Sequence, residues 1–394
     1  MSEHILRQYV RKSDHPVLCL GPMSRNCVDA VVSYANHLRK PLPLVASRRQ
    51  IECAEFNGGY VNGWDTRSFA QYVRERDKGG FVPICRDHAG PWQGSQEAHL
   101  PCTEAIARAK QSIAEDIHAG FDLIHLDPSA EQESTTSPVV DILFDLYSFV
   151  FETARKLGRT VEIEIGAEQQ SGMISDTHEL VSLLKAVTRH CEKNGFQKPL
   201  FCVVQTGTLV REMRNVGFTE GRRNETYDQK YAVESMEKNV RHLVDLAYIN
   251  GVFVKEHNGD YLSDGSMMLR RALGVGGVNI APELGVFETK ILVHLCVELG
   301  LQAELDAMLQ LFYESKKWVK WLRTDSQASD FDKAIMAGHY SFSSPAFIET
   351  KERIQRTAAR QQLDVDTYLK TALTTLLQRF AWNLGYYKEV SRAV

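Results

Sequence analysis

The sequence predicts an α/β protein, a (β/α)8 TIM barrel with a C-terminal helical extension. Short apolar runs alternate with amphipathic helical patterns up to about residue 300, and only helical patterns follow. Eight apolar runs joined by helical crossovers fit a barrel, which takes roughly 250 residues. A doubly wound parallel sheet is the competing architecture. No GxGxxG motif follows the first run, which disfavours the dinucleotide-binding form of that alternative.

The expected strands are short and continuously apolar. Because they lack a polar alternation, they fit strands that are buried on both faces of a parallel sheet. They span residues 17–20, 42–46, 81–85, 123–126, 161–165, 200–204, 251–254 and 277–280.

Amphipathic segments lie between these strands. In segment 104–118, residues Ile106, Ala109, Ile113 and Ile117 recur at the three- and four-residue spacing of a helix face. The same pattern predicts helices over 139–157, 178–191 and 231–248. Glycines follow the helical segments, as expected at helix C-termini: Gly120, Gly158, Gly195 and Gly251.

The last hundred residues carry only helical patterns, over 302–322, 344–360 and 365–384. Ser344-Pro345 and Asp364 are suitable helix starts. We therefore expect a barrel domain over residues 1–300 and a helical extension over 301–394 that packs on the barrel or closes it.

Composition narrows the class of protein. The chain has 394 residues, 43% hydrophobic and 24% charged, as in soluble globular proteins. The net charge is −4 without a basic tract, so we expect no nucleic-acid partner. No apolar run approaches the roughly 20 residues that span a bilayer, so we expect no membrane partner. Eight cysteines without a CxxC pair indicate a reducing compartment, and we expect a cytoplasmic protein.

One stretch, residues 82–92, joins an apolar strand to a charged pair. Its sequence is Val-Pro-Ile-Cys-Arg-Asp-His-Ala-Gly-Pro-Trp, in which Asp87 and His88 precede the chain-stopping Gly90-Pro91. A neutral imidazole can bind a cation while a neighbouring carboxylate moves a proton. The pair therefore suits metal and proton chemistry.

The other expected strands also end in polar residues, and in a barrel these ends converge on one mouth. They are His125, Asp127 and Ser129 after strand four, Glu162, Glu164 and Glu168 around strand five, Gln205, Thr206 and Thr208 after strand six, Glu256, His257, Asn258 and Asp260 after strand seven, and Asn279 and Glu283 at strand eight. Imidazoles and carboxylates around one opening favour a divalent cation.

Structural roles fit some of these residues equally well. His125 suits a hydrogen-bonded core histidine as well as a functional one, and Asp127 before Pro128 suits a turn. Glu162 and Glu164 alternate along one strand and point the same way, where an unpaired carboxylate is costly. They therefore need either a cation or a basic partner.

Six motifs follow one another between residues 20 and 290. They are Gly58-Gly59-Tyr60, Arg86-Asp87-His88-Ala89-Gly90-Pro91, Ala119-Gly120-Phe121 with Ile124-His125-Leu126-Asp127-Pro128-Ser129, Gly166-Ala167-Glu168, Val203-Val204-Gln205-Thr206-Gly207 and Glu256-His257-Asn258-Gly259-Asp260-Tyr261. In this order they resemble the GGYTGM, GDHLGP, AGF…IHLDxS, GTE, VVQPG and EAHSTDYQ segments of the accessory, non-catalytic subunits of class II tagatose-bisphosphate aldolase. That family is related to the metal-dependent class II fructose- and tagatose-bisphosphate aldolases.

The resemblance implies a set of site residues. It makes Asp87 the proton-transferring acid/base, and His88, His257 and Glu164 the ligands of a divalent metal, which is usually Zn²⁺ in the catalytic enzymes. Asn279 resembles a substrate-binding asparagine. We add the nearby carboxylates as catalytic candidates and the remaining mouth residues as substrate-binding candidates. The catalytic candidates are Glu168 and Asp127, and the substrate-binding ones are Gly259, Asp260, Gln205 and Arg211.

The chain departs from the catalytic pattern in three places. The catalytic enzymes carry a further histidine after strand six, where this chain has Gln205 to Thr208, so Gln205, Glu164 or Glu168 would complete the coordination. Their phosphate-gripping lysine is missing, and Arg211 is a candidate substitute. Asp260 stands where a serine and glycine occur, and its charge would repel phosphate. Whether the substrate is phosphorylated therefore stays open.

Three functions fit this sequence. The first is a metal-dependent class II aldolase-like enzyme, a carbon–carbon lyase that performs aldol, retro-aldol or retro-aldol epimerisation chemistry on a sugar or sugar phosphate. The second is an accessory subunit that stabilises a separate catalytic aldolase, and the third is a sugar-binding barrel without a metal. Retaining Asp, His, Glu and His at strand ends costs desolvation, which favours the enzyme. We also expect a homo-oligomer.

Overall fold

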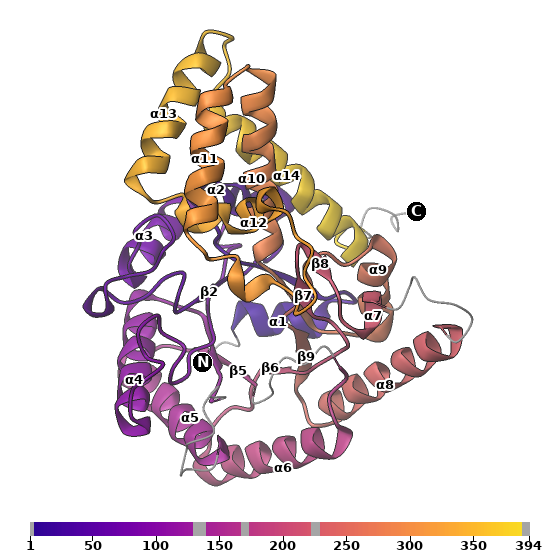
Figure 1. The fold of residues 1–394 in the computed structure, drawn as a ribbon. Coiled ribbons are helices and arrows are strands. Elements are labelled where there is room, and N and C mark those ends of the chain that lie inside the picture. The colour runs from indigo at the N-terminus through magenta and orange to yellow at the C-terminus, as the bar shows by residue number, and fades with distance from the viewer. Residues whose placement is uncertain (1–3, 129–138, 167–172, 222–228, 388–394) are drawn as a thin grey trace, which may run out of the picture.

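The computed structural model describes residues 4–128, 139–166, 173–221 and 229–387. Eight parallel strands close into a barrel in the order β1-β10-β9-β6-β5-β4-β3-β2, which confirms the predicted fold class (Figure 1). Each expected strand supplies one of them. Their bounds are β1 Val17–Leu20, β2 Leu44–Ser47, β3 Ile84–Asp87, β4 Leu123–Leu126, β5 Glu162–Ile165, β6 Phe201–Val203, β9 Phe253–Glu256 and β10 Gly277–Ile280.

Helices surround the barrel and cover the outward faces of its strands. They are α2 Arg25–Leu38, α3 Thr66–Arg76, α4 Cys102–Ala119, α5 Val139–Lys156, α6 Thr177–Asn194, α8 Gln229–Ile249 and α9 Asp264–Leu273. Local sequence sets their ends. Asp65 accepts the Ser68 N–H in a capping box that starts α3, and Gly120 and Gly195 end α4 and α6 in the left-handed conformation, as predicted.

The N-terminal helix α1, Ile5–Lys12, closes the end of the barrel opposite the mouth. Its Leu6 and Val10 join a buried cluster with Val17 and Leu123 from the barrel interior. Arg7 on the same helix donates to both carboxylate oxygens of Glu162, at distances of 2.5–3.0 Å. The basic partner that Glu162 requires therefore comes from outside the barrel.

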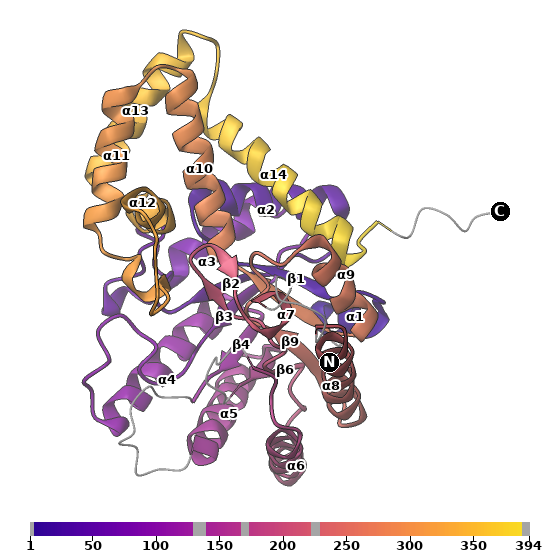
Figure 2. The same ribbon diagram turned by 45° about the vertical axis from the view of Figure 1, so that its right-hand side comes forward.

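The residues after β10 form a helical projection and then return to the barrel. α10 Pro282–Glu298, α11 Gln302–Glu314, α12 Asp330–Ala337 and α13 Pro345–Ala359 enclose their own apolar cluster, which includes Met308, Phe312 and Ile354 (Figures 1 and 2). Helix α14, Val365–Leu384, then packs against α2 and α9 and buries Leu377 and Phe380 in the barrel's outer core. It occupies the position of the eighth barrel helix. The last helix of the extension thus closes the barrel, and the division of the chain at residue 300 stays a prediction.

Several short elements were not predicted. A hairpin of β7 Val210–Arg211 and β8 Arg214–Asn215, followed by α7 Phe218–Gly221, lies after β6. The predicted helix over 302–322 ends at Glu314 and continues only as a single 3-10 turn, η2 Val319–Trp321. Further 3-10 turns are η1 Ala54–Phe56 and η3 Gly338–Ser341.

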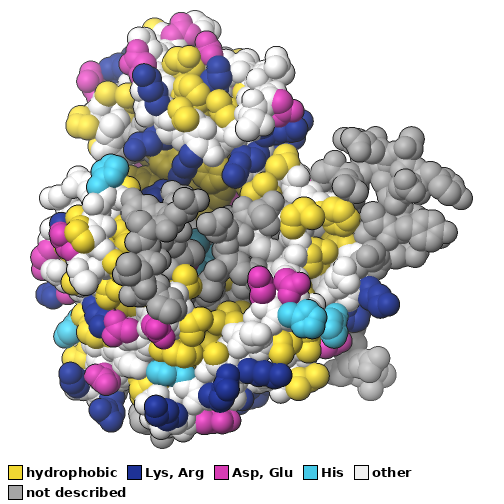
Figure 3. Space-filling view, turned by 60° about the horizontal axis from the view of Figure 1, so that its bottom comes forward, with side chains coloured by type: hydrophobic (Ala, Val, Ile, Leu, Met, Phe, Trp, Pro, Cys, Tyr) yellow, Lys and Arg dark blue, Asp and Glu magenta, His cyan; other side chains and the backbone are white. Residues whose placement is uncertain are grey.

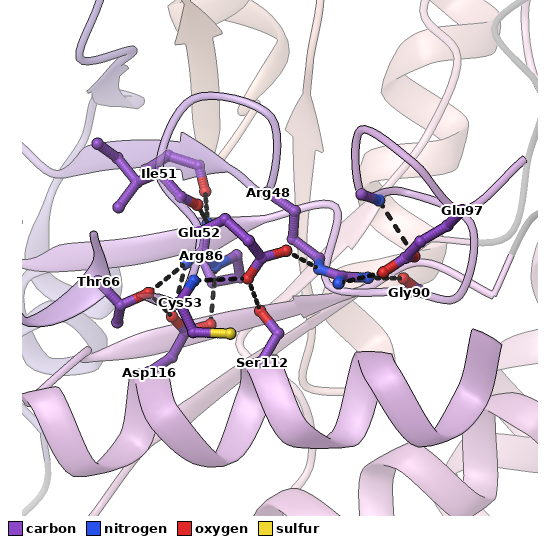
Figure 4. A network of polar contacts seen from close by, with 12 residues as sticks. Arg48, Ile51, Glu52, Cys53, Thr66, Arg86, Gly90, Glu97, Ser112 and Asp116 are labelled. Carbon is purple, nitrogen blue, oxygen red and sulfur yellow. Dashed lines mark hydrogen bonds and ion pairs between the residues drawn. The ribbon is translucent and has the colours of Figure 1, made fainter. Parts of the chain in front are cut away.

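A buried ion-pair network fixes the loops that follow β2 and β3 (Figure 4). Arg48 donates to Glu52 at 2.7 Å and to Glu97 at 2.5 and 2.8 Å. Arg86, fully buried, donates to both oxygens of Asp116. Because buried charges are costly unless paired, these contacts set the loop positions beside the mouth.

Among the described residues, no helix is long and apolar enough to cross a membrane.

Candidate metal centre

The mouth of the barrel gathers side chains from β3, β4, β5 and β9. In register, Ser47 of β2 lies beside Asp87 of β3, and His125 of β4 beside Glu164 of β5. Continuing the β3–β4 register by one residue puts Asp87 beside His125. Register neighbours on adjacent strands share a face of the sheet, so Asp87, His125 and Glu164 all point into the barrel. The closed barrel thus brings together groups that are far apart along the chain.

Asp87 lies at the middle of three imidazoles. Its Oδ1 is 3.2 Å from His125 Nδ1 and 3.6 Å from His257 Nδ1, and its Oδ2 is 3.7 Å from His88 Nε2. One donor atom from each of these four residues lies within 4.8 Å of all the others. The ring centroids of the histidines are 4.7–5.3 Å apart.

His88 occupies a constrained backbone position. Its φ of 48° lies in the left-handed region, which is uncommon for a residue other than glycine. Its backbone N–H donates to His125 Nδ1 at 3.1 Å, and its Nδ1 contacts Asp127 Oδ2 at 2.6 Å. A side chain at position 90 would overlap the carbonyl oxygen of Asp127, so the glycine lets the backbone at Gly90 lie directly against the backbone at Asp127. With Nδ1 engaged by Asp127, Nε2 of His88 is left to face Asp87.

His257 is oriented in the same manner by Glu164. The Nε2 of His257 contacts Glu164 Oε1 at 2.6 Å, while Lys255 Nζ donates to Glu164 Oε2 at 2.5 Å. Glu164 therefore has the basic partner that its burial requires. The four grouped donor residues do not include it, although its Oε1 also lies 4.0 Å from His125 Nδ1. The role of Glu164 as a metal ligand stays a prediction.

The electrostatics favour a charged carboxylate at the centre. Burial raises the pKa of Asp87, but His88, His257 and His125 lower it by more, so the pKa lies well below its ordinary value. Burial lowers the pKa of His88, but Asp87 and Asp127 more than offset this and raise it to about 9. Burial lowers the pKa of His257. Burial raises the pKa of Glu164, and Lys255 with the neighbouring histidines brings it down to about 2.

The donor set fits a divalent cation. His257 Nδ1 and His125 Nε2 are buried and have no hydrogen-bond partner among the described residues. Buried polar atoms of this kind are normally satisfied, so each unpaired nitrogen needs an explanation. Three imidazoles with a carboxylate beside them are a donor set that Zn²⁺ and other borderline divalent metals accept.

Three further predicted mouth residues lie in β10 or directly after β6. Asn279 on β10 is buried, and its Oδ1 has no partner within the described part of the chain; the same holds for Thr206 Oγ1 after β6. Gln205 is also buried, and its backbone N–H donates to Ser175 Oγ. Their roles in substrate binding stay predictions.

Three of the remaining predicted residues have contacts within the fold. Asp260 Oδ1 accepts the backbone N–H groups of Ala281 and Glu283, at 2.9 and 2.8 Å, at the start of α10. Gly259 has no room for a side chain against Val278. Arg211 on the β7–β8 hairpin donates to Val210 O. Glu168 falls outside the described residues.

Sequence reasoning left two residues of this arrangement unassigned. His125 was equally compatible with a core role, and its place beside Asp87 follows from β4 lying next to β3. The signal for it was the Ile124-His125-Leu126-Asp127 motif. Lys255 was missed because the predicted strand ends at residue 254. In the structure β9 extends to Glu256, and Lys255 forms a buried ion pair with Glu164.

No family model matches the chain. A probable tagatose 6 phosphate kinase from Sinorhizobium meliloti 1021 superposes with a TM-score of 0.70 and 16% identity, over 93% of this chain and 100% of that one. The fructuronate-tagaturonate epimerase UxaE from Cohnella laeviribosi gives a TM-score of 0.57 and 12% identity, over 94% of this chain and 82% of that one. At these identities the likeness shows a shared TIM-barrel fold and nothing finer.

Proposed function

We propose that this protein is a metal-dependent, class II aldolase-like enzyme that makes or breaks a carbon–carbon bond in a sugar or sugar phosphate. The observation that carries the proposal is the cluster of His88, His125 and His257 around the Asp87 carboxylate. Retro-aldol epimerisation falls within the same chemistry, because it breaks and re-forms one such bond.

The three imidazoles would hold the cation, for which we propose Zn²⁺. His125 takes the place of the histidine that is absent after strand six. Glu164, a ligand that the resemblance implies, and Asp127, a catalytic candidate, would also fix which ring nitrogen of His257 and His88 faces the centre. A bound cation would polarise a substrate carbonyl and stabilise the enediolate formed on cleavage.

Asp87 would move the proton. Its carboxylate is anionic at neutral pH, since its pKa is held low, and it lies at the centre of the cluster. It can accept the proton of a substrate hydroxyl during cleavage and return it during addition. The unpaired oxygens of Asn279 and Thr206 are suited to bind substrate hydroxyls. We also propose Glu168 as a catalytic residue. The remaining proposed substrate-binding residues are Gln205, Arg211, Gly259 and Asp260.

An accessory role is the second candidate, and one observation favours it. The segment after β6 offers Gln205 and Thr206 instead of a histidine, and Asp260 is engaged by backbone groups of α10. In that case the barrel would stabilise a separate catalytic aldolase, as the resemblance implies. The two candidates differ in whether Asp87 matters for activity.

Metal analysis of the purified protein tests the proposal. We expect about one zinc ion per chain, lost in His88→Ala, His125→Asn and His257→Asn but kept in His118→Ala, which removes an exposed histidine on α4. Asp87→Asn should keep the metal and lose turnover on a panel of ketoses and their phosphates. No metal after reconstitution, or full activity of Asp87→Asn, would overturn the enzyme proposal. A stable complex with a catalytic aldolase would then support the accessory role.

A further inference from the structure

The helical projection reaches over the mouth of the barrel and is tied to two mouth loops. The N–H of Glu212, between β7 and β8, donates to Trp321 O in η2 at 3.0 Å. On the other side, Ser343 Oγ accepts the Asn62 N–H at 2.6 Å and donates to Tyr60 O at 2.9 Å. Residues from the last third of the chain therefore form part of the rim.

An aromatic platform lies at this junction. The rings of Tyr60 and Tyr340 are 4.9 Å apart, and Trp321 Nε1 donates to the Tyr340 hydroxyl at 3.2 Å. The Lys320 Nζ lies 4.9 Å from the centroid of the Trp321 ring and 5.1 Å from that of Tyr340. These cation–π contacts hold the ammonium group in a defined place.

The positive charge at this platform makes no ion pair among the residues that the structure describes. Lys320 and Arg49 are exposed, and neither makes an ion pair within the described parts of the chain. Desolvation by the surrounding groups lowers the pKa of Lys320, and the charges of Arg49 and Lys317 lower it further, to about 8. Two cations that repel one another beside aromatic rings are stabilised when an anion binds between them and forms charge-assisted hydrogen bonds with both.

The cations lie on the mouth side of the molecule. Arg49 follows Ser47, the β2 residue that pairs with Asp87, and Trp321 lines a small cavity with Tyr261, which follows His257 in the β9 loop. Figure 3 shows Lys and Arg side chains gathered around a hollow beneath the helical projection, with a largely hydrophobic floor. An anion held by Lys320 and Arg49 would therefore lie on the same side of the barrel as the candidate centre.

We propose that Lys320 and Arg49 form an anion-binding subsite between the helical projection and the β2 loop, and that it binds the negatively charged group of the substrate, a phosphate or a carboxylate. This assignment rests on the proposed function for the identity of the ligand as a sugar derivative. The aromatic platform would support the sugar carbons next to the charged group. The Lys320–Arg49 subsite also explains how a chain with Asp260 in place of a phosphate-binding serine and glycine can still bind an anionic sugar.

Calorimetric titration with inorganic phosphate, and with acetate at equal ionic strength, tests the subsite. The protein is the full-length chain carrying His257→Asn, so that no metal contributes to anion binding. We expect binding that weakens at least about tenfold in Lys320→Gln and in Arg49→Gln. Lys316→Gln, which removes an exposed lysine from the same segment, should bind as its parent does. Preference for phosphate or for acetate would show which charged group the subsite takes.

The failure of this proposal differs from the failure of the proposed function. Absence of phosphate and acetate binding, or binding that is equal in all variants, overturns the subsite whatever the metal analysis shows. If the enzyme is active, Lys320→Gln should raise KM for an anionic sugar. It should leave kcat, and KM for the corresponding uncharged sugar, nearly unchanged. An equal effect on both sugars would also contradict the subsite.

Discussion

His88 and His257 each engage a buried carboxylate through one ring nitrogen, which leaves the other nitrogen for the candidate centre. Carboxylate partners of this kind fix the ring orientation and raise the basicity of the donor nitrogen. Asp127 and Glu164 would therefore act on a metal through the imidazole rings that they contact. Spacing along the chain could not assign these roles, because they depend on which strand ends meet inside the barrel.

Asp127→Asn tests this role at the scale of one residue. We expect metal affinity to fall about 10–100-fold, because a neutral amide fixes the orientation of the His88 ring, and raises the basicity of its other nitrogen, less strongly than a carboxylate does. Competition with a chelator, followed by metal analysis, measures the change. Asp330→Asn, which alters an exposed carboxylate on α12, should have no effect. Unchanged affinity in Asp127→Asn would contradict the role of Asp127.

Metal binding should depend on pH through His88. Its pKa is raised to about 9 in the metal-free protein, so at neutral pH a cation must displace a proton from the imidazole. Affinity should therefore rise about tenfold per pH unit between neutral pH and about 9, and then level off. Calorimetry in buffers of different ionisation enthalpy should detect the released proton. A pH-independent affinity would be inconsistent with His88 as a ligand.

At the scale of elements, the strands were predicted well and the short connections were not. The eight apolar runs carry their own signal because both faces of each strand are buried. The β7–β8 hairpin and α12 carry little signal, since each is short and is stabilised mainly by its neighbours. Helix α1 was not predicted either. Its role depends on Arg7 meeting Glu162, 155 residues away.

Arg7→Met tests how α1 closes the barrel. Removing the guanidinium leaves Glu162 buried without its ion-pair partner, so the free energy of unfolding should fall by about 3–5 kcal/mol. Urea unfolding followed by circular dichroism measures this loss. Adding Glu162→Leu to Arg7→Met should recover most of it, because no buried charge then remains. Lys12→Met, on the exposed end of the same helix, should change stability little; equal effects at both positions would argue against the ion pair.

At the scale of the whole molecule, the chain closes its barrel with its last described helix. Helices α10 to α13 leave the barrel after β10, and α14 returns between α2 and α9 (Figure 2). The barrel core and the projection are thus joined through both α10 and α14. We infer that the projection and the barrel fold as one unit, because the eighth helix position is filled only after the projection has been traversed.

Phe380→Ala measures the contribution of α14 to the barrel. Its ring is fully buried, so truncation should cost about 3–5 kcal/mol in the free energy of unfolding. Trp382→Ala, on the same helix and 69% exposed, should cost far less. Thermal unfolding should remain a single transition in both variants. A separate early transition in Phe380→Ala, with the barrel retained, would indicate that α14 is not part of the barrel's cooperative unit.

The sequence by itself determined the barrel class, its strands, the helices α4, α5, α6 and α8, and the presence of Asp87, His88 and His257 at strand ends. These follow from local patterns: apolar runs, helical periodicity and polar residues directly after strands. Only the tertiary structure decided that His125 joins the cluster, that Glu164 contacts His257, and that α14 is the helix of the extension that closes the barrel. The physical reason is that partners across a closed barrel are set by strand order and side-chain direction, which place distant residues in contact without any local signal.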